Sequence, residues 1–210
     1  MKWVCDFETT TDVNDCRVWL WGAKAIGDKL FLYGTSIKEF IAWCSNHCGD
    51  TIYFHNAKFD TEFIFAYLLS NGWKHIIKDA QRSKKTFSTL ISDQGIFYSC
   101  RIYFTKYDYV TINDSFKILP FKVKKIAQDF GLPMGKAEIN YEKPRGLDYK
   151  PDENEVEYLY RDCEIVATVL NQIFTLGLTK MTQGSDALHD FTSTIGGGKT
   201  FKRYFPDTKL

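Results

Sequence analysis

KWVCDFE, residues 2–8, is the stretch that decides the fold expected for this chain of 210 residues. In a β-strand, alternate side chains point to opposite faces, so Val4, Asp6 and Glu8 would share one face and the aromatic residues and the cysteine the other. Two acids spaced in this way lie roughly 7 Å apart, close enough to hold a pair of metal ions. A solvent-facing edge strand that happens to carry two acids would explain the same pattern.

Residues 151–178 predict a long helix with Pro151 in its first turn. Apolar residues at helical spacing form two stripes, which is typical of a helix packed inside a domain. Asp162 interrupts one stripe, and Tyr158 lies one turn before it. A buried carboxylate without a partner costs several kcal/mol, so Asp162 is expected to face a cation. A metal ion would serve, and so would an ion pair with Arg161.

Asp60 follows a short β-prone run at 51–54 and opens a predicted helix at 58–69. An acid in the first turn of a helix can simply be a favourable partner of the helix dipole. The aromatic and polar residues around it would normally belong to a core, yet they could also stack unpaired bases at about 1–3 kcal/mol each. These residues are Tyr53, His55, Asn56, Phe59 and Phe63.

The remaining pattern predicts an α/β protein in which a mixed β-sheet is flanked by α-helices. Strands are expected at 17–23, 29–33, 86–92, 95–104 and 109–113, and helices at 36–47 and 123–130. The only stretch with the composition of a linker is 195–199.

Composition indicates one compact domain whose net charge is too small to produce a strong overall electrostatic field. The chain has 27 basic and 26 acidic residues and a net charge of +1, so any nucleic-acid site must be a local basic and aromatic groove. No apolar run reaches 18 residues, and two acids precede any core of a signal peptide. We therefore expect a cytoplasmic protein without a membrane partner.

Three motifs in order carry a family resemblance: DxE at 6–8, YxHNxxFD at 53–60 and YxxxD at 158–162. They resemble the Exo I, Exo II and Exo III motifs of DEDD-type 3′→5′ exonucleases with a tyrosine in the third motif. More closely, CDFETT, CRVW, NDSFKILPF, VKKIAQDFGL and MTQGSDAL resemble the N-terminal proofreading domain of protein-primed family B DNA polymerases of bacteriophages. The resemblance implies a ribonuclease H-like exonuclease domain over 1–195. Residues 196–210 would be the segment that leads toward the family's polymerase domain.

The resemblance also implies a set of site residues. Asp6, Glu8, Asp60 and Asp162 would hold two Mg²⁺ or Mn²⁺ ions, and the Tyr158 hydroxyl would orient the attacking water. Lys136 would stabilise the phosphate in catalysis, although an ordinary solvated lysine explains the same residue. Phe116 stands where the family usually has a leucine. The residues expected to contact DNA are Thr9, Tyr53, His55, Asn56, Phe59, Phe63, Ser115, Phe116 and Tyr141.

These implications predict a two-metal 3′→5′ exonuclease that acts on the 3′ end of single-stranded DNA and has no polymerase activity by itself. The chain would be free-standing or the proofreading part of a split, truncated or engineered polymerase. In the split case, a separate polymerase chain or a terminal protein would be its partner in the host bacterial cytoplasm. Two alternatives stay open. One is a non-catalytic module that binds single-stranded DNA or terminal protein, and the other is a ribonuclease of the same superfamily.

Overall fold

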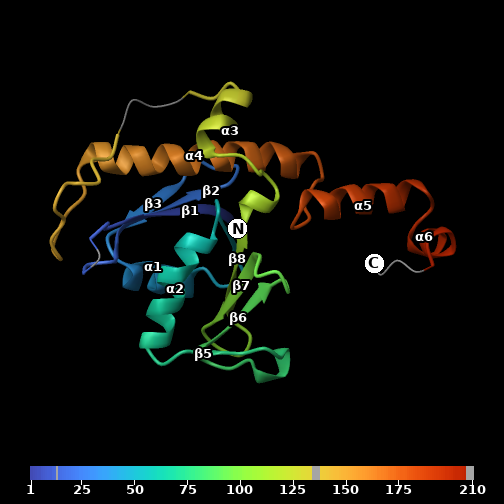
Figure 1. The fold of residues 1–210 in the computed structure, drawn as a ribbon, viewed down its shortest axis with the longest axis horizontal. Helices are drawn as coiled ribbons and strands as arrows, with labels where there is room; N and C mark the ends of the chain where they lie inside the picture. The colour runs from blue at the N-terminus through green and yellow to red at the C-terminus, as the bar shows by residue number, and fades with distance from the viewer. Residues whose placement is uncertain (13, 134–137, 207–210) are drawn as a thin grey trace.

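The computed structural model describes residues 1–12, 14–133 and 138–206, and its centre is one mixed β-sheet (Figure 1). Its strands are β1 (Lys2–Thr9), β2 (Val18–Ala25), β3 (Phe31–Gly34), β4 (Thr51–Phe54), β5 (Lys74–His75), β6 (Thr86–Ile91), β7 (Phe97–Tyr103) and β8 (Tyr109–Asp114). The spatial order is β3-β2-β1-β4-β8-β7-β6-β5. β1, β4 and β8 run parallel to one another, while β2, β3 and β7 pair antiparallel with their neighbours.

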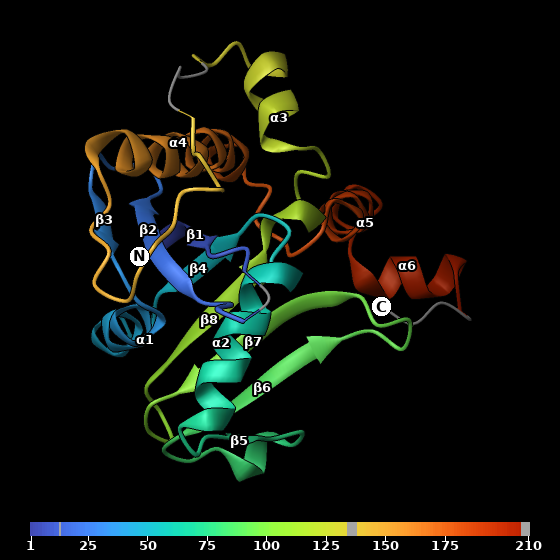
Figure 2. The same cartoon turned by 60° about the vertical axis from the view of Figure 1, so that its left-hand side comes forward.

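Helices cover both faces of the sheet. They are α1 (Ile37–Asn46), α2 (Lys58–Ser70), α3 (Val123–Asp129), α4 (Glu153–Thr175), α5 (Gln183–Thr194) and α6 (Gly198–Tyr204), with short 3₁₀ turns η1 (Asp79–Gln81) and η2 (Ser115–Lys117). In Figure 2, α3 and α4 lie on one side of β1 and β2, and α1 lies on the other. The predicted mixed sheet flanked by helices is therefore confirmed. No helix in the described ranges is both long and apolar enough to cross a membrane.

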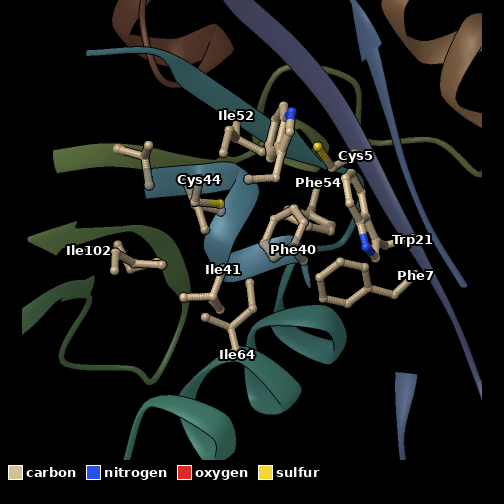
Figure 3. Close-up of a cluster of buried hydrophobic side chains, with 14 of the residues drawn as sticks. Cys5, Phe7, Trp21, Phe40, Ile41, Cys44, Ile52, Phe54, Ile64 and Ile102 are labelled. Atoms are coloured by element: carbon tan, nitrogen blue, oxygen red, sulfur yellow. The ribbon is translucent and has the colours of Figure 1, made fainter. Parts of the chain in front are cut away.

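The alternation along β1 divides the interior into two cores. Trp3, Cys5 and Phe7 pack with α1 and α2 in the first core, part of which Figure 3 shows around Phe40. Val4 belongs to the second core, which is built largely from α4 and α3. Each buried aromatic or aliphatic side chain of these cores contributes about 1.5–3 kcal/mol relative to an exposed one. The two-sided burial of β1 confirms the face assignment predicted from KWVCDFE.

α4 begins later than predicted. Pro151 precedes the helix, and Asp152 is its N-cap residue, whose carboxylate accepts from the Glu155 backbone N–H. The Glu155 carboxylate accepts in return from the Asp152 N–H, which completes a capping box. The Asp152 carboxylate can accept from a free backbone N–H of the first turn, which a proline side chain cannot do. The capping box, and not Pro151, therefore sets the start of α4.

Two short helices near the C-terminal end were not predicted. α5 and α6 project beyond the end of α4, away from the sheet (Figure 1). Among their residues only Asp186 and Phe201 are buried, so these helices add little to the two cores. The linker expected at 195–199 is also shorter, because Gly198 and Lys199 already belong to α6.

Candidate active site

β1 carries two acids into the interior of the sheet. Asp6 and Glu8 share a face with Val4, whose neighbours belong to α4 and the second core. β1 lies between β2 and β4, so the alternative of a solvent-facing edge strand is wrong. Glu8 is buried and Asp6 is half-buried. The backbone N–H of Phe7 donates to Asp6 Oδ1 at 3.0 Å.

α4 brings Tyr158 and Asp162 to the same face of the sheet. Both side chains are half-buried on the helix that crosses β1 and β2. Burial raises the pKa of Asp162 to about 6, and a hydrogen bond from the Tyr158 hydroxyl limits the rise. Arg161 pairs instead with Glu157 one turn earlier, at 2.6 Å. The alternative in which Arg161 neutralises Asp162 is therefore wrong.

Asp60 reaches the site from the first turn of α2, as predicted. Because β1 and β4 are parallel, their carboxyl ends meet at one edge of the sheet, and α2 begins just beyond that edge. Asp60 is buried, and burial together with the charge of Asp6 raises its pKa well above the usual value. A helix N-terminus alone would favour the ionised form, so burial, followed by the charge of Asp6, outweighs the dipole here.

The four acids form one electrostatic cluster. Burial, then the Asp162 charge, raises the pKa of Asp6 to about 7. Burial, then the charges of Asp6 and Asp162, raises the pKa of Glu8 to about 9. The cation that opposes this rise is Arg145, whose charge lowers the pKa of Glu8. Among the described residues, one buried arginine against four acids leaves a deficit of positive charge at this place.

Oxygen ligands of this kind suit Mg²⁺ and Mn²⁺, so the donor set fits the predicted cofactor. No three His, Cys, Asp or Glu side chains of the described residues are positioned to hold one metal ion. Side-chain rotation about χ angles would be needed to bring the carboxylates onto shared ions. The chemistry of the donors, and not a preformed cage, is what supports the metal assignment.

Some of the predicted DNA contacts lie where a strand could reach them. Phe59 is 51% exposed and meets the half-buried Phe63 edge to face, with ring centroids 5.3 Å apart. Asn56 is exposed, and Thr9 is half-buried at the end of β1. Burial, then the charge of Glu8, raises the pKa of the exposed Tyr141, so its phenol lies beside the acid cluster. These residues surround the edge at which Asp60 and Glu8 lie.

Two predicted contacts are contradicted by burial. Tyr53 is 5% exposed and packs against Phe174 in the second core, so its ring has no free face for a base. Ser115 is fully buried, and its hydroxyl donates to the Phe54 carbonyl at 3.1 Å. A strand cannot contact either side chain in this structure.

His55 and Phe116 are intermediate cases. The Nδ1 of His55 lies 3.0 Å from Ser115 Oγ and its Nε2 lies 2.7 Å from the Phe121 carbonyl, so both ring nitrogens are engaged. Phe116 is half-buried beside the His55 ring. Only the ring faces of these two residues remain for a base.

Lys136 lies outside the described residues, and its predicted role stays a prediction.

Sequence reasoning missed two residues that organise the site. Arg145 is buried and stands next to Glu155 at the start of α4, although its loop sequence resembles a solvated segment. Asp114 is buried at the end of β8 and binds the backbone that leads into α2. An acid directly after an alternating strand, as in TINDS, was the available signal for Asp114.

Comparison with known proteins identifies the family to which the chain belongs. Residues 44–162 match the family model described as DNA polymerase type B, organellar and viral. The chain is 43% identical over 211 residues to the DNA polymerase of Bacillus phage phi29, and 30% identical over 217 residues to that of Streptococcus phage Cp-1. These alignments include 98% and 96% of this chain, respectively, but only 36% of each phage polymerase.

Solved structures agree with the sequence matches. Phi29 DNA polymerase complexed with single-stranded DNA has a TM-score of 0.87 and 41% identity over 96% of this chain and 36% of that one. The same polymerase complexed with primer-template DNA gives the same values. The chain thus spans about a third of the length of the proteins it matches.

Proposed function

Because this chain belongs to the organellar and viral type B DNA polymerases and matches the N-terminal, exonuclease part of the protein-primed phage enzymes, we propose that it hydrolyses single-stranded DNA from the 3′ end. The observation that carries the proposal is the cluster of Asp6, Glu8, Asp60 and Asp162, whose pKa values are all raised and which no matching set of cations from the described residues neutralises. The fold expected from the motifs is that of the matched polymerase region. Residues 1–195 would form the nuclease domain, and 196–210 would lead toward a polymerase domain.

The four carboxylates are the residues that would hold two Mg²⁺ or Mn²⁺ ions. Such ions, when bound, activate the attacking water and stabilise the leaving 3′ oxygen. Their oxygen-only donor set matches these hard cations. Because the pKa values of Asp6 and Glu8 are raised to about 7 and about 9, ion binding at neutral pH must displace protons from both acids.

Tyr158 has a positioning part in this reaction. Burial, then the Asp162 charge, raises the pKa of its phenol far above neutrality, so the hydroxyl keeps its proton. A protonated phenol cannot act as the general base but can fix a water molecule by hydrogen bonding. Its place between Tyr141 and Asp162 puts that hydroxyl at the acid cluster.

The exposed groups around the cluster would hold the strand. Phe59, Phe63 and Tyr141 offer aromatic faces for unstacked bases, at about 1–3 kcal/mol for each stacked base. Asn56 and Thr9 offer polar groups beside them. The phosphate contact proposed for Lys136 would complete the set. A separate polymerase chain or terminal protein, in the cytoplasm of a bacterial host, would supply the primer end.

A nuclease assay tests the proposal. A 5′-labelled single strand should shorten stepwise from its 3′ end in Mg²⁺ or Mn²⁺ and stay intact in EDTA. The combined change Asp6→Ala and Glu8→Ala should abolish cleavage and leave the affinity for DNA in Ca²⁺ within a few fold. Glu157→Ala, which removes an acid of α4 whose side chain is 45% exposed, should cleave normally.

The same assay separates the alternatives. Binding without cleavage under all metal conditions would identify a non-catalytic binding module. Faster cleavage of a matched RNA strand would identify a ribonuclease. Cleavage that persists in excess EDTA would exclude the carboxylate cluster as a metal site.

A further inference from the structure

Asp114 occupies a junction between the sheet and the helix that carries Asp60. It is the last residue of β8 and pairs in register with Phe54 at the end of β4. Its side chain is 2% exposed. An ionised carboxylate in such a place is stable only if hydrogen bonds and a counter-charge satisfy it.

The contacts of Asp114 are directed at the backbone. Its Oδ1 accepts from the N–H groups of Asn56 at 3.1 Å, Ala57 at 3.2 Å and Phe116 at 3.0 Å. Its Oδ2 pairs with Lys117 Nζ at 3.1 Å. One carboxylate therefore ties together two segments that lie almost sixty residues apart in the sequence.

The corner at residues 55–57 has no comparable support of its own. Ala57, the residue before α2, makes no side-chain hydrogen bond that would cap the helix. Asn56 has a φ of 67°, a left-handed conformation that is uncommon for residues other than glycine. Helix starts leave backbone N–H groups without partners, and here a side chain from β8 accepts from two N–H groups at this entry.

His55 strengthens the same connection. Its two ring nitrogens contact Ser115 Oγ and the Phe121 carbonyl, both beyond the end of β8. The residues that follow β8 thus hold the corner at residues 55–57 in place. Ser115 takes part by contacting the His55 ring and the Phe54 carbonyl, and not by contacting DNA. Asp60 and Phe59 follow this corner by two to four residues on the first turn of α2.

We propose that Asp114 is a positioning residue of the nuclease site: by accepting from Asn56 and Ala57, it fixes the first turn of α2 and so places Asp60 and Phe59. The inference rests on the proposed exonuclease activity for its rate measurement. Displacement of a reacting group by about 1 Å can reduce a rate by on the order of 10²-fold. Loss of Asp114 should therefore reduce turnover well beyond what its effect on stability explains.

The test compares three variants of the full chain. Asp114→Ala removes the acceptor, and Asp114→Asn keeps an oxygen that can accept from the same N–H groups. Asp186→Ala is the matched control, because Asp186 is also a buried acid that accepts a backbone N–H, from Lys180, but belongs to α5. If Asp114→Ala does not fold, Asp114→Ser, which keeps one short acceptor, replaces it.

Two measurements are made on each variant: the single-turnover rate on single-stranded DNA in Mg²⁺, and amide hydrogen exchange at residues 56–60 in EDTA. We expect Asp114→Ala to lose about 10–100-fold in rate and to exchange faster at 56–57. Asp114→Asn should stay within a few fold on both, and Asp186→Ala should lose melting temperature only.

The outcomes separate this inference from the proposed function. Equal exchange at 56–57 and an equal rate in Asp114→Ala would overturn the positioning role, even in an active nuclease. A rate loss in Asp186→Ala as large as that in Asp114→Ala would also overturn it, since general destabilisation would then suffice. A wild-type chain that cleaves nothing would refute the proposed function, while the exchange measurement would still decide whether Asp114 fixes the corner.

Discussion

Breaking the buried ion pair between Arg145 and Glu155 should destabilise the protein and loosen the loop beside the active site. The Arg145 guanidinium is 2% exposed and the Glu155 carboxylate 5%, with Nη2 and Oε1 at 2.9 Å. Arg145 also donates to the carbonyls of Asn140 and Lys143, at 2.9 and 3.2 Å. Its guanidinium lies 4.0 Å from the centre of the Trp19 ring. It therefore holds the turn that carries Tyr141.

The perturbation is Arg145→Met, which keeps most of the side-chain volume and removes the charge. Removing one partner of a buried pair typically costs about 3–5 kcal/mol, because the other charge is left unpaired. The cost should lie toward the lower value here, since Glu155 keeps its ion pair with Lys143 at 3.5 Å and bonds from the Tyr149 hydroxyl at 2.5 Å and the Asp152 N–H at 3.0 Å. For a chain of this size, each kcal/mol shifts the melting temperature by about 2–4 °C, so a cost of about 3 kcal/mol predicts a fall of about 6–12 °C.

The assay is thermal and urea unfolding of three variants. They are Arg145→Met, Glu155→Gln and the combination of both changes. Because the two side chains touch, the double variant should cost less than the sum of the single variants, with a coupling of about 0.5–3 kcal/mol. Arg161→Met is the control: it breaks the pair with Glu157 on the same helix, whose side chains are 37% and 45% exposed. Exposed pairs contribute at most about 1 kcal/mol.

The reasoning predicts a functional effect as well. If Arg145 holds the turn with Tyr141, Arg145→Met should weaken single-strand binding in Ca²⁺, at a temperature where the variant is still folded. A loss below about 1 kcal/mol, equal to that of the Arg161→Met control, would refute a buried and paired Arg145. Strict additivity of the two single changes would refute the pair itself.

Three further predictions concern the acid cluster and the DNA surface. Tyr158→Phe should keep the melting temperature and lose about 10–100-fold in single-turnover rate, and an unchanged rate would remove its hydroxyl from the site. Phe59→Ala should weaken single-strand binding by about 1–3 kcal/mol, measured by fluorescence anisotropy, whereas Tyr53→Phe should bind as the wild type does because the Tyr53 ring is buried. In EDTA, the stability contributed by Asp6 and Glu8 should be lost as pH rises from about 6 to about 9, because these acids, with pKa values of about 7 and 9, keep protons that the unfolded chain has released. Glu8→Gln or added Mg²⁺ should flatten this fall in unfolding experiments, and a metal-free protein that gains stability from pH 6 to 9 would contradict it.

Local patterns predicted most of the elements because they are set by periodicity. The alternation in residues 2–8 fixed the two faces of β1, and burial on both sides confirms it. The apolar stripes of α4 predicted a buried helix with Asp162 facing inward. The bounds predicted for α1, 36–47, lie within one residue of the observed ones, and Ser36 is its N-cap residue, accepting from the Glu39 N–H.

Long-range packing decided what could not be predicted. Tyr53 and Ser115 belong to motifs that suggest DNA contacts, yet Phe174 covers one and His55 and Phe54 engage the other. Nothing local in the sequence says which aromatic or hydroxyl group will be covered by a segment far along the chain. Arg145 was missed for the same reason, because its partner Glu155 and the Trp19 ring come together only in the folded chain.

A carboxylate fixes the start of two of the three elements that carry the acid cluster. β1 is fixed by pairing on both sides, whereas α2 and α4 each begin at a point where a carboxylate accepts backbone N–H groups. For α4 that carboxylate is local, since Asp152 and Glu155 cap the helix from within its own sequence. For α2 it is Asp114, which comes from another strand.

This difference has a physical consequence. A local cap forms with its helix, so Tyr158 and Asp162 should keep their places on α4 whenever that helix is folded. The start of α2 depends instead on β8 being docked beside β4, because Asp114 reaches Asn56 only in that arrangement. Of the four acids, Asp60 should therefore be the one whose position responds most to changes far from it in the sequence. Hydrogen exchange at the start of α2 should accordingly be more sensitive to substitutions in β8 than exchange at the start of α4, and equal sensitivity at both helix starts would contradict this order.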